Sequence, residues 1–373
     1  MDILESTEGY EQWLGQRLSL VEADLTLKHQ YMAENFFDFM RATFYRWVQL
    51  WKKHCDDLAD TPVVLSVGDL HTDNFGSWRD VEARLIWGIN DFDEVYPLPY
   101  TFDLVRLAAS AYLALSEDYG SADLESISRS ILSGYTSGLK ARGKPFVLAE
   151  DNGWLRDLMI ENLKDPARFW EKLEELPHLP GILPEDAKQA IEAALPKHGL
   201  RYYISHRTAG LGSLGRQRFL AMIELSNSHA AREAKELTAS ACLWALDGKK
   251  GTKKGTSEIF YSEILQTSIR CLDPFLQVHD RWVVRRLLPD YSRIELTDLE
   301  NDTVHSLLKA MGWETANIHL GSGEVIKDVR KDLKDKKDTE TWLADAADRM
   351  IEALSDDFEE WQAYWEETER TRK

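Results

Sequence analysis

Two polar loops that follow strand-like segments constrain the fold of this chain more than any other feature. The apolar run VVLSV at 63–67 leads into GDLHTDN at 68–74, and ARLIWGIN at 83–90 leads into DFDE at 91–94. Apolar, β-branched runs of this length are typical of strands. Asp and Asn are common in surface turns because they hydrogen-bond locally, but two acidic loops in succession favour a functional site over ordinary turns.

Most of the remaining chain has helical periodicity. In the segment before residue 60, Phe36, Met40, Phe44, Trp47 and Trp51 recur at spacings of three and four, which predicts one apolar helical face. A core helix explains this stripe better than any binding function does.

A second β-rich region begins near residue 200. RYYISHRTA, GLGSLG at 210–215 and RQRFLAMIEL read as strand, glycine turn and strand. We therefore expect an α+β fold with two lobes. Residues 1–196 are predicted to form a large helical lobe that holds the two polar loops, residues 197–296 a small antiparallel β-rich lobe, and residues 297–373 helices that return to the large lobe.

Composition narrows the possible partners. The 373 residues carry 45 Lys and Arg against 64 Asp and Glu, a formal charge of −19. This balance argues against a nucleic-acid or anionic-membrane binder and favours a neutral or cationic small molecule as the acceptor, although a local site can oppose the net charge. Three widely spaced cysteines with no C-x-x-C pair, no signal-peptide pattern and no long apolar run lead us to expect a cytoplasmic protein.

The first loop contains the residue types that phosphoryl transfer needs. A carboxylate must orient or deprotonate the acceptor hydroxyl, and a neutral oxygen must hold Mg²⁺ nearby; Asp69 and Asn74 supply both. Asp91, directly after the second strand, is a natural further ligand for this hard cation. DFDE resembles the kinase D-F-G pattern, with Asp93 in place of glycine.

The glycine turn admits two interpretations. A G-x-G-x-x-G sequence between two strands is the context in which kinases close backbone groups over nucleotide phosphates, whereas a plain β-hairpin is the alternative. Lys235, in REAKEL, is placed to pair nucleotide phosphates, and Glu263 on the next predicted helix is its best candidate partner. In ordinary kinases these elements precede the catalytic loop, but here Gly210 follows Asp69 by roughly 140 residues. A circular permutation reconciles the order, because chain termini commonly lie close together at the surface.

The block VGDLHTDNFG…INDFDEVYPLPYTFDLVRLAAS resembles the bacterial family called domain of unknown function 2252. AGLGSLGRQRF, REAKEL, SEILQTSIRCLDPF and GWETANIHLGSGE match in the family's order, so that the resemblance covers roughly residues 35–365. It implies a circularly permuted kinase-like fold, similar to aminoglycoside phosphotransferases, that uses ATP and Mg²⁺. It does not supply a substrate.

The resemblance also implies residue roles. Asp69 would be catalytic, and Asn74 and Asp91 would be metal ligands. Beside these, we expect His71, Asp93, Asp103 and Arg106 to be supporting residues. The implied nucleotide-binding residues are Gly210, Gly212, Ser213, Gly215, Lys235 and Glu263. Val67 stands where many kinases have the histidine of an H-x-D triplet, which is a departure from their pattern. The resemblance explains neither the helices of 121–196 nor the basic loop 248–255.

These residues fit three functions to different degrees. An Mg²⁺- and ATP-dependent phosphotransferase acting on a small hydroxyl-bearing molecule leads, with adenylyl transfer as a close variant. A non-catalytic nucleotide-binding regulator would not need Asp69, and a dinuclear metallophosphoesterase would need further histidines. The phosphotransferase requires Gly212 and Lys235 to face Asp69 and Asp91 across one cleft roughly 10 Å wide, and a helix at 305–319 to pack beside strand 63–67.

Overall fold

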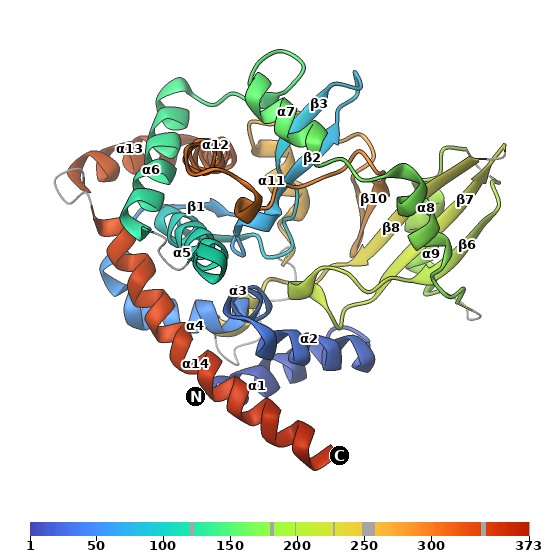
Figure 1. The fold of residues 1–373 in the computed structure, drawn as a ribbon, viewed down its shortest axis with the longest axis horizontal. Coiled ribbons are helices and arrows are strands. Elements are labelled where there is room, and N and C mark those ends of the chain that lie inside the picture. Colours follow the sequence, from blue (N-terminus) through green and yellow to red (C-terminus); the bar gives the residue numbers. More distant parts are fainter. Residues whose placement is uncertain are drawn as a thin grey trace.

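Helix α5 (Tyr100–Tyr119) runs through the middle of the helical part of the protein and is buried along nearly all of residues 101–116. Its sequence is apolar around most of the helix, as in helices enclosed by others. Helices α6 (Leu124–Ala141), α12 (Asn301–His319) and α14 (Trp342–Arg372) pack against it (Figure 1). The computed structural model describes residues 1–119, 123–179, 183–197, 199–226, 228–247, 258–336 and 341–372.

The N-terminal segment forms four helices: α1 (Ile3–Gly15), α2 (Glu22–Glu34), α3 (Phe36–Ala42) and α4 (Phe44–His54). The predicted continuous helical face is broken at Thr43, whose φ of −114° and ψ of 38° are not helical. The Thr43 hydroxyl donates to the Phe39 carbonyl at 2.7 Å, which stabilises the break. Trp47 and Trp51 remain buried in the main core, as the apolar stripe predicts.

Both predicted strands that precede the polar loops are present. β1 (Val63–Ser66) pairs antiparallel with β4 (Tyr96–Pro99), and β3 (Leu85–Ile89) lies between β2 (Phe75–Arg79) and β5 (Phe146–Val147). Short 3-10 helices occur at Asp56–Leu58, Thr72–Asn74, Leu211–Ser213, Leu296–Asp298 and Leu320–Val325. These small sheets present the loops that end at Asn74 and begin at Asn90.

Helices α6 and α12 pack with their backbones in contact. A Cβ added at Gly134 would lie 1.8 Å from the Lys309 carbonyl oxygen, and one at Gly312 would lie 2.1 Å from that of Ile131. Only glycine allows so close an approach. Helix α12 also contacts β1, as predicted for residues 305–319, and continues toward α13 (Ile326–Asp335).

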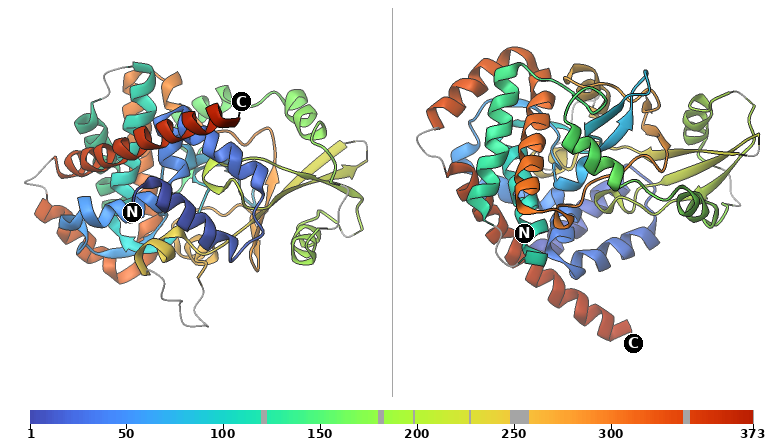
Figure 2. Two further views of the ribbon diagram at one scale, coloured as in Figure 1. Left: turned by 90° about the horizontal axis from the view of Figure 1, so that it is seen from below. Right: turned by 45° about the horizontal axis from the view of Figure 1, so that its top comes forward.

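The second body is an antiparallel sheet of five strands in the order β6-β7-β8-β10-β9. Figure 2 shows this sheet extending to one side of the helices. The strands are β6 (Tyr202–His206), β7 (Arg218–Leu225), β8 (Ser228–Glu236), β9 (Gln277–His279) and β10 (Trp282–Leu287). Because side chains alternate along a strand, Phe219 and Ala221 face one side of the sheet while Leu220 and Met222 face the other.

The predicted boundary at residue 196 requires a correction. Helices α8 (Pro166–Glu174) and α9 (Glu185–Ala193) pack on the five-stranded sheet rather than in the helical body. Ile191 of α9 packs with Trp282 and its neighbours on one face, and Leu173 of α8 packs with Leu220 on the other. Each helix buries an apolar face that the sheet alone would leave exposed to water. Helix α7 (Gly153–Glu161), just before them, contributes Leu155 and Met159 to the main core.

The predicted β-rich lobe, residues 197–296, also needs a second correction, because two of its helices do not belong to it. Helices α10 (Ala241–Asp247) and α11 (Tyr261–Thr267), which follow β8, pack against the helical body. Cys242, Tyr261 and Ile264 belong to the main hydrophobic core. The basic loop 248–255 lies outside the described residues. Within the described part of the chain, no helix combines the length and the apolar character needed to cross a bilayer.

The contact between α6 and α12 predicts a position-specific effect of alanine. Gly312→Ala should lower the free energy of unfolding by about 2 kcal/mol or more, because the new methyl group collides with the Ile131 backbone. Gly153→Ala is the matched control, since a Cβ there meets nothing within 4 Å, and it should leave stability unchanged or raise it by up to about 1 kcal/mol. Urea unfolding of the two variants measures the difference; equal midpoints would contradict the close packing.

Candidate functional site

Asp69 lies in the loop after β1, and α5 holds its carboxylate. Its Oδ1 accepts a hydrogen bond of 2.9 Å from Nε of Arg106 and a second, shorter one from Nη2. Arg106 is completely buried, with its guanidinium over the rings of Phe44 and Trp47. Burial raises the pKa of Asp69, and the charge of Arg106 offsets only part of this effect. Both bonds use Oδ1, so Oδ2 accepts neither of them, and Asp69 lines the adjoining cavity.

One helical turn earlier, Asp103 fixes the backbone of the same loop. Its carboxylate accepts hydrogen bonds from the amides of Val67 at 2.7 Å and Gly68 at 2.9 Å. His319, at the end of α12, lies 3.0 Å from the same carboxylate, and its other ring nitrogen lies 2.9 Å from the Tyr135 hydroxyl. Asp103 and Arg106 thus hold the backbone and the carboxylate of this loop from a single helix.

The rest of the first loop is also tightly bound. The Asn74 Oδ1 atom accepts from the His71 amide at 2.6 Å and keeps a second lone pair. Asp73 pairs with Arg41 at 3.1 Å and with Arg293 at 2.9 Å. Burial lowers the pKa of His71 well below its usual value, with a further contribution from Arg41, so its ring is neutral at pH 7.

The second loop meets Lys235 of β8. Nζ of Lys235 lies 3.2 Å from Oδ1 of Asp91 and 2.7 Å from Oδ2 of Asp93. Burial opposes the charge of Asp91, but Lys235 and Arg285 outweigh it and hold the pKa of Asp91 well below its usual value. Burial and the neighbouring Asp91 raise the pKa of Asp93 instead. Asp91 therefore carries a negative charge beside Lys235, and its side chain is 38% exposed.

The glycine segment approaches Asp69 more closely than predicted. A Cβ added at Gly212 would lie 3.3 Å from Oδ2 of Asp69, so the expected separation of roughly 10 Å is wrong for this pair. The segment is drawn inward because it docks on α2 and α3, with the Val21 amide donating to the Gly215 carbonyl at 2.9 Å. Within it, the Ser213 hydroxyl accepts from Arg218 at 2.7 Å.

Gly210 borders the other end of this segment. A Cβ there would lie 2.8 Å from Nη2 of Arg218, so the glycine makes room for this guanidinium. Gly210, Gly212 and Ser213 line the same cavity as Asp69.

Glu263 is not brought to Lys235. It is exposed on α11, a helix that packs on the helical body, and the carboxylates beside Lys235 in the described residues are those of Asp91 and Asp93. The predicted pairing is therefore wrong. Its place is taken by the second aspartate of DFDE.

Glu94, the last residue of DFDE, joins the two bodies. Its Oε1 accepts from Arg216, just after the glycine segment, at 2.7 Å, and its Oε2 accepts from the Ala241 amide at the start of α10 at 2.7 Å. Glu94 is buried, and an acidic side chain at a helix N-terminus is stabilised by the free amides there. The sequence signal for the linking role of Glu94 is the number of acidic residues in DFDE, which exceeds what a metal site needs.

A cavity of about 580 Å³ connects these groups. Among its lining side chains are Phe169 and Leu287, which pack with the five-stranded sheet, and Tyr291, which packs with the cluster around Trp78. Eight cations line it, in excess of six acids: Lys28, Arg41, Lys164, Arg207, Arg216, Arg218, Arg285 and Arg293, against Asp69, Asp73, Asp91, Asp93, Glu94 and Glu295. Sequence reasoning missed most of these cations because they lie on separate elements, and only the fold assembles them.

Lys28 is the least expected of these cations. It is 2% exposed on α2, and its Nζ lies 5.5 Å from the centre of the Tyr45 ring. Burial lowers the pKa of its ammonium group. No motif signals this residue, since a lone lysine on an amphipathic helix is ordinarily solvated.

The residues present suit a magnesium ion bound together with phosphates. The carboxylate of Asp91 and the amide oxygen of Asn74 line one cavity, and Mg²⁺ commonly takes one or two such protein ligands plus phosphate oxygens. Among the described residues, no group of three or more His, Cys, Asp or Glu side chains is arranged to hold a metal without other ligands.

Most of the chain is similar to one family of known proteins. Residues 19–152 and 200–364 match the family described as "Uncharacterized protein conserved in bacteria (DUF2252)". No curated protein and no solved structure matches the chain. The matched residues include both polar loops, the glycine segment and Lys235, whereas α8 and α9 fall in the unmatched interval.

Glu314 of α12 lies beneath the strand that leads to Asp91. It is 1% exposed, its Oε2 accepts from Asn317 at 2.7 Å, and its Oε1 is 3.4 Å from the Ile89 amide. Burial raises its pKa to about 7, and Arg270 offsets this only in part. The folded protein therefore holds a proton on this carboxyl that the unfolded chain releases at a lower pH.

This difference predicts how stability changes with pH. Between about pH 4.5 and pH 7 the folded state binds the proton of Glu314 and the unfolded state does not, so this group's contribution to stability falls as pH rises and is lost above pH 7. Glu314→Gln should remove this pH dependence, because a glutamine side chain stays neutral. At pH 8 the free energy of unfolding of the variant should exceed that of the parent by up to about 3 kcal/mol. Thermal unfolding at pH 5, 6, 7 and 8 measures it; parallel profiles for the two proteins would contradict a raised pKa.

Proposed function

This chain belongs to the bacterial family DUF2252, and we propose that it is a magnesium- and ATP-dependent phosphotransferase acting on a hydroxyl-bearing small molecule. The observation that carries the proposal is the convergence of distant segments on one cavity. Asp69 and Asp91 line it together with the glycine segment, and Lys235 lies behind Asp91 at 3.2 Å, although roughly 140 residues separate the two pairs of elements in the chain. Phosphoryl transfer requires this convergence, because the phosphates, their counter-charges and the acceptor must be held together.

The topology of the five-stranded sheet supports a kinase-like relationship. The glycine segment connects its first two strands, β6 and β7, and Lys235 lies on its third, β8. Protein kinases place a glycine-rich loop and a phosphate-pairing lysine on strands in the same way. In our proposal the chain is a circular permutation of that arrangement, in which the sheet follows the catalytic and metal loops along the sequence instead of preceding them.

Each residue then has a role that its surroundings favour. Asp69, held through Oδ1 by Arg106, orients the acceptor hydroxyl with Oδ2 and accepts its proton, for which its raised pKa is suited. Lys235 pairs the donor phosphates. Asn74 and Asp91 would hold Mg²⁺, which when bound neutralises charge on the phosphates.

The contact between Gly212 and Asp69 limits the direction of approach. The gap between them admits little more than a methyl group, so in our proposal the phosphoryl group reaches Asp69 from the side of Asn74 and Asp91. Adenylyl transfer would use the same residues with the nucleotide reversed. The released product separates the two reactions, because phosphoryl transfer yields ADP and adenylyl transfer yields pyrophosphate.

Ligand-induced stabilisation tests the assignment. Mg-ATP at 100 times its dissociation constant should stabilise the parent protein by about 2.7 kcal/mol. Asp91→Ala should lose the Mg²⁺-dependent part of this shift, because it removes the carboxylate next to Lys235 while Asp93 still pairs the lysine. Thermal-shift measurements with ATP, with and without Mg²⁺, give the result.

Asp69→Asn is the matched control. Its amide oxygen still accepts from the buried Arg106, so we expect the Mg-ATP shift to persist while ATP turnover over a panel of hydroxyl acceptors falls by about 100-fold or more. Equal Mg-ATP shifts in the parent and in Asp91→Ala would overturn the metal assignment. An absence of any nucleotide effect on the parent would overturn the proposal as a whole.

A further inference from the structure

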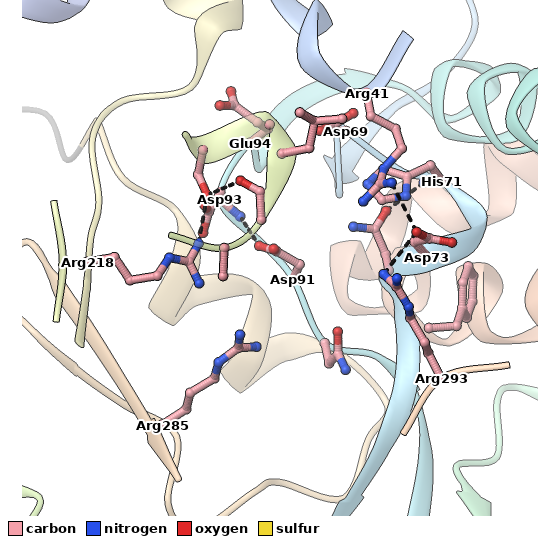
Figure 3. Close-up of a pocket in the computed structure, with 18 of the residues that line it drawn as sticks. Arg41, Asp69, His71, Asp73, Asp91, Asp93, Glu94, Arg218, Arg285 and Arg293 are labelled. Carbon is pink, nitrogen blue, oxygen red and sulfur yellow. Dashed lines mark hydrogen bonds and ion pairs between the residues drawn. The ribbon is translucent and has the colours of Figure 1, made fainter. Parts of the chain in front are cut away.

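The cavity face of the five-stranded sheet carries charged residues where a sheet face is ordinarily apolar. In the register of the strands, Arg218 lies opposite Lys235 and Arg285 lies opposite Glu233. Glu233 and Lys235 are two residues apart and therefore share a face. All four side chains thus lie on the same side of the sheet, and Figure 3 shows Arg218 and Arg285 directed into the cavity.

Glu233 gathers three arginines around one carboxylate. Arg285 donates to its Oε1 from Nε at 2.7 Å, and Arg218 donates to the same atom from Nη1 at 3.0 Å. Arg207, just after β6, pairs with Oε2. Because Arg285 uses Nε for its hydrogen bond, its two terminal nitrogens remain available toward the cavity.

The charges of this cluster do not balance. Glu233 is 1% exposed and Arg218 is 5% exposed, so one buried negative charge faces three positive ones. Asp91 and Asp93, the other carboxylates that act on Arg218, are already engaged by Lys235. Burial, together with repulsion by Arg285, lowers the pKa of Arg207 to about 9.

Arg207 is 24% and Arg285 is 32% exposed and both line the cavity, so the excess of positive charge faces the cavity, where it attracts an anion. We propose that Arg207, Arg218 and Arg285 form a phosphate-binding subsite at the sheet end of the cavity, with Glu233 holding the three guanidinium groups in register. A phosphate group matches the subsite because its charge approaches two at neutral pH and its oxygens accept the paired donors of a guanidinium fork. Lys164, which also lines the cavity, adds a further cation at this end.

The inference rests on the proposed function only in taking the ligand to be a phosphate compound of this cavity. It requires neither Mg²⁺ nor transfer, and it assigns residues that are not among the proposed catalytic and metal-binding ones. Two sources of the phosphate group are compatible with it: the phosphate chain of the donor nucleotide, or a phosphate ester on the acceptor.

Calorimetric titration with inorganic tripolyphosphate in the absence of Mg²⁺ tests the subsite. The parent protein should bind it, and Arg285→Gln should weaken binding by at least 10-fold. Arg286→Gln is the matched control, because the neighbouring Arg286 donates to the Tyr291 hydroxyl and points to the opposite face of β10. It should leave the affinity within about 2-fold of the parent.

Two further arms identify the source of the phosphate. If Arg285→Gln weakens ATP but not adenosine, the subsite holds the donor's phosphates; if it weakens ribose 5-phosphate with ATP present, it holds an acceptor's phosphate ester. Arg207→Gln serves as a second variant should Arg285→Gln not fold. Equal affinities of the parent, Arg285→Gln and Arg207→Gln for every phosphate probe would overturn the inference, while a retained Asp91- and Mg²⁺-dependent ATP shift would leave the proposed function standing.

Discussion

The buried carboxylate of Asp103 is the constraint on which the rest of the site depends. It accepts two backbone amides, those of Val67 and Gly68, and it contacts His319. Leaving such groups unpaired away from water would cost several kcal/mol, so the loop can hardly move relative to α5. Because Arg106 lies one turn further along the same helix and holds Asp69, both the position and the orientation of this carboxylate are set by one rigid element.

Local sequence patterns predicted the parts of the site that local structure determines. The strands before Asp69 and Asp91 and the two strands that flank the glycine turn could be predicted because apolar runs and glycine turns specify short elements directly. The placement of α8 and α9 could not, since an apolar stripe shows that a helix buries a face but not which surface covers it. The same limit applies to the glycine segment, whose approach to Asp69 results from its docking on α2 and α3.

The error at Glu263 shows how an expected residue role can pass to a neighbour. A lysine on the third strand needs a carboxylate partner because its charge is nearly buried, and the resemblance suggested a glutamate on the following helix. Here α11 packs on the helical body, while Asp93 lies 2.7 Å from the lysine. The partner of the lysine therefore comes from the same motif as Asp91. Which carboxylate reaches the lysine depends on how the two bodies pack, and the spacing of residues in the sequence does not predict it.

Net charge is a poor guide to what this cavity prefers. The chain carries −19 overall, which favoured a neutral or cationic acceptor when only composition was considered. Charges on the outer surface act across salt water and are screened within about 10 Å, whereas those inside a cavity act through a medium of lower dielectric constant. With cations in excess among the lining side chains, the local field opposes the global one. The cationic residues around Glu233, rather than the sum over the chain, therefore determine that anionic groups are favoured at the sheet end of the cavity.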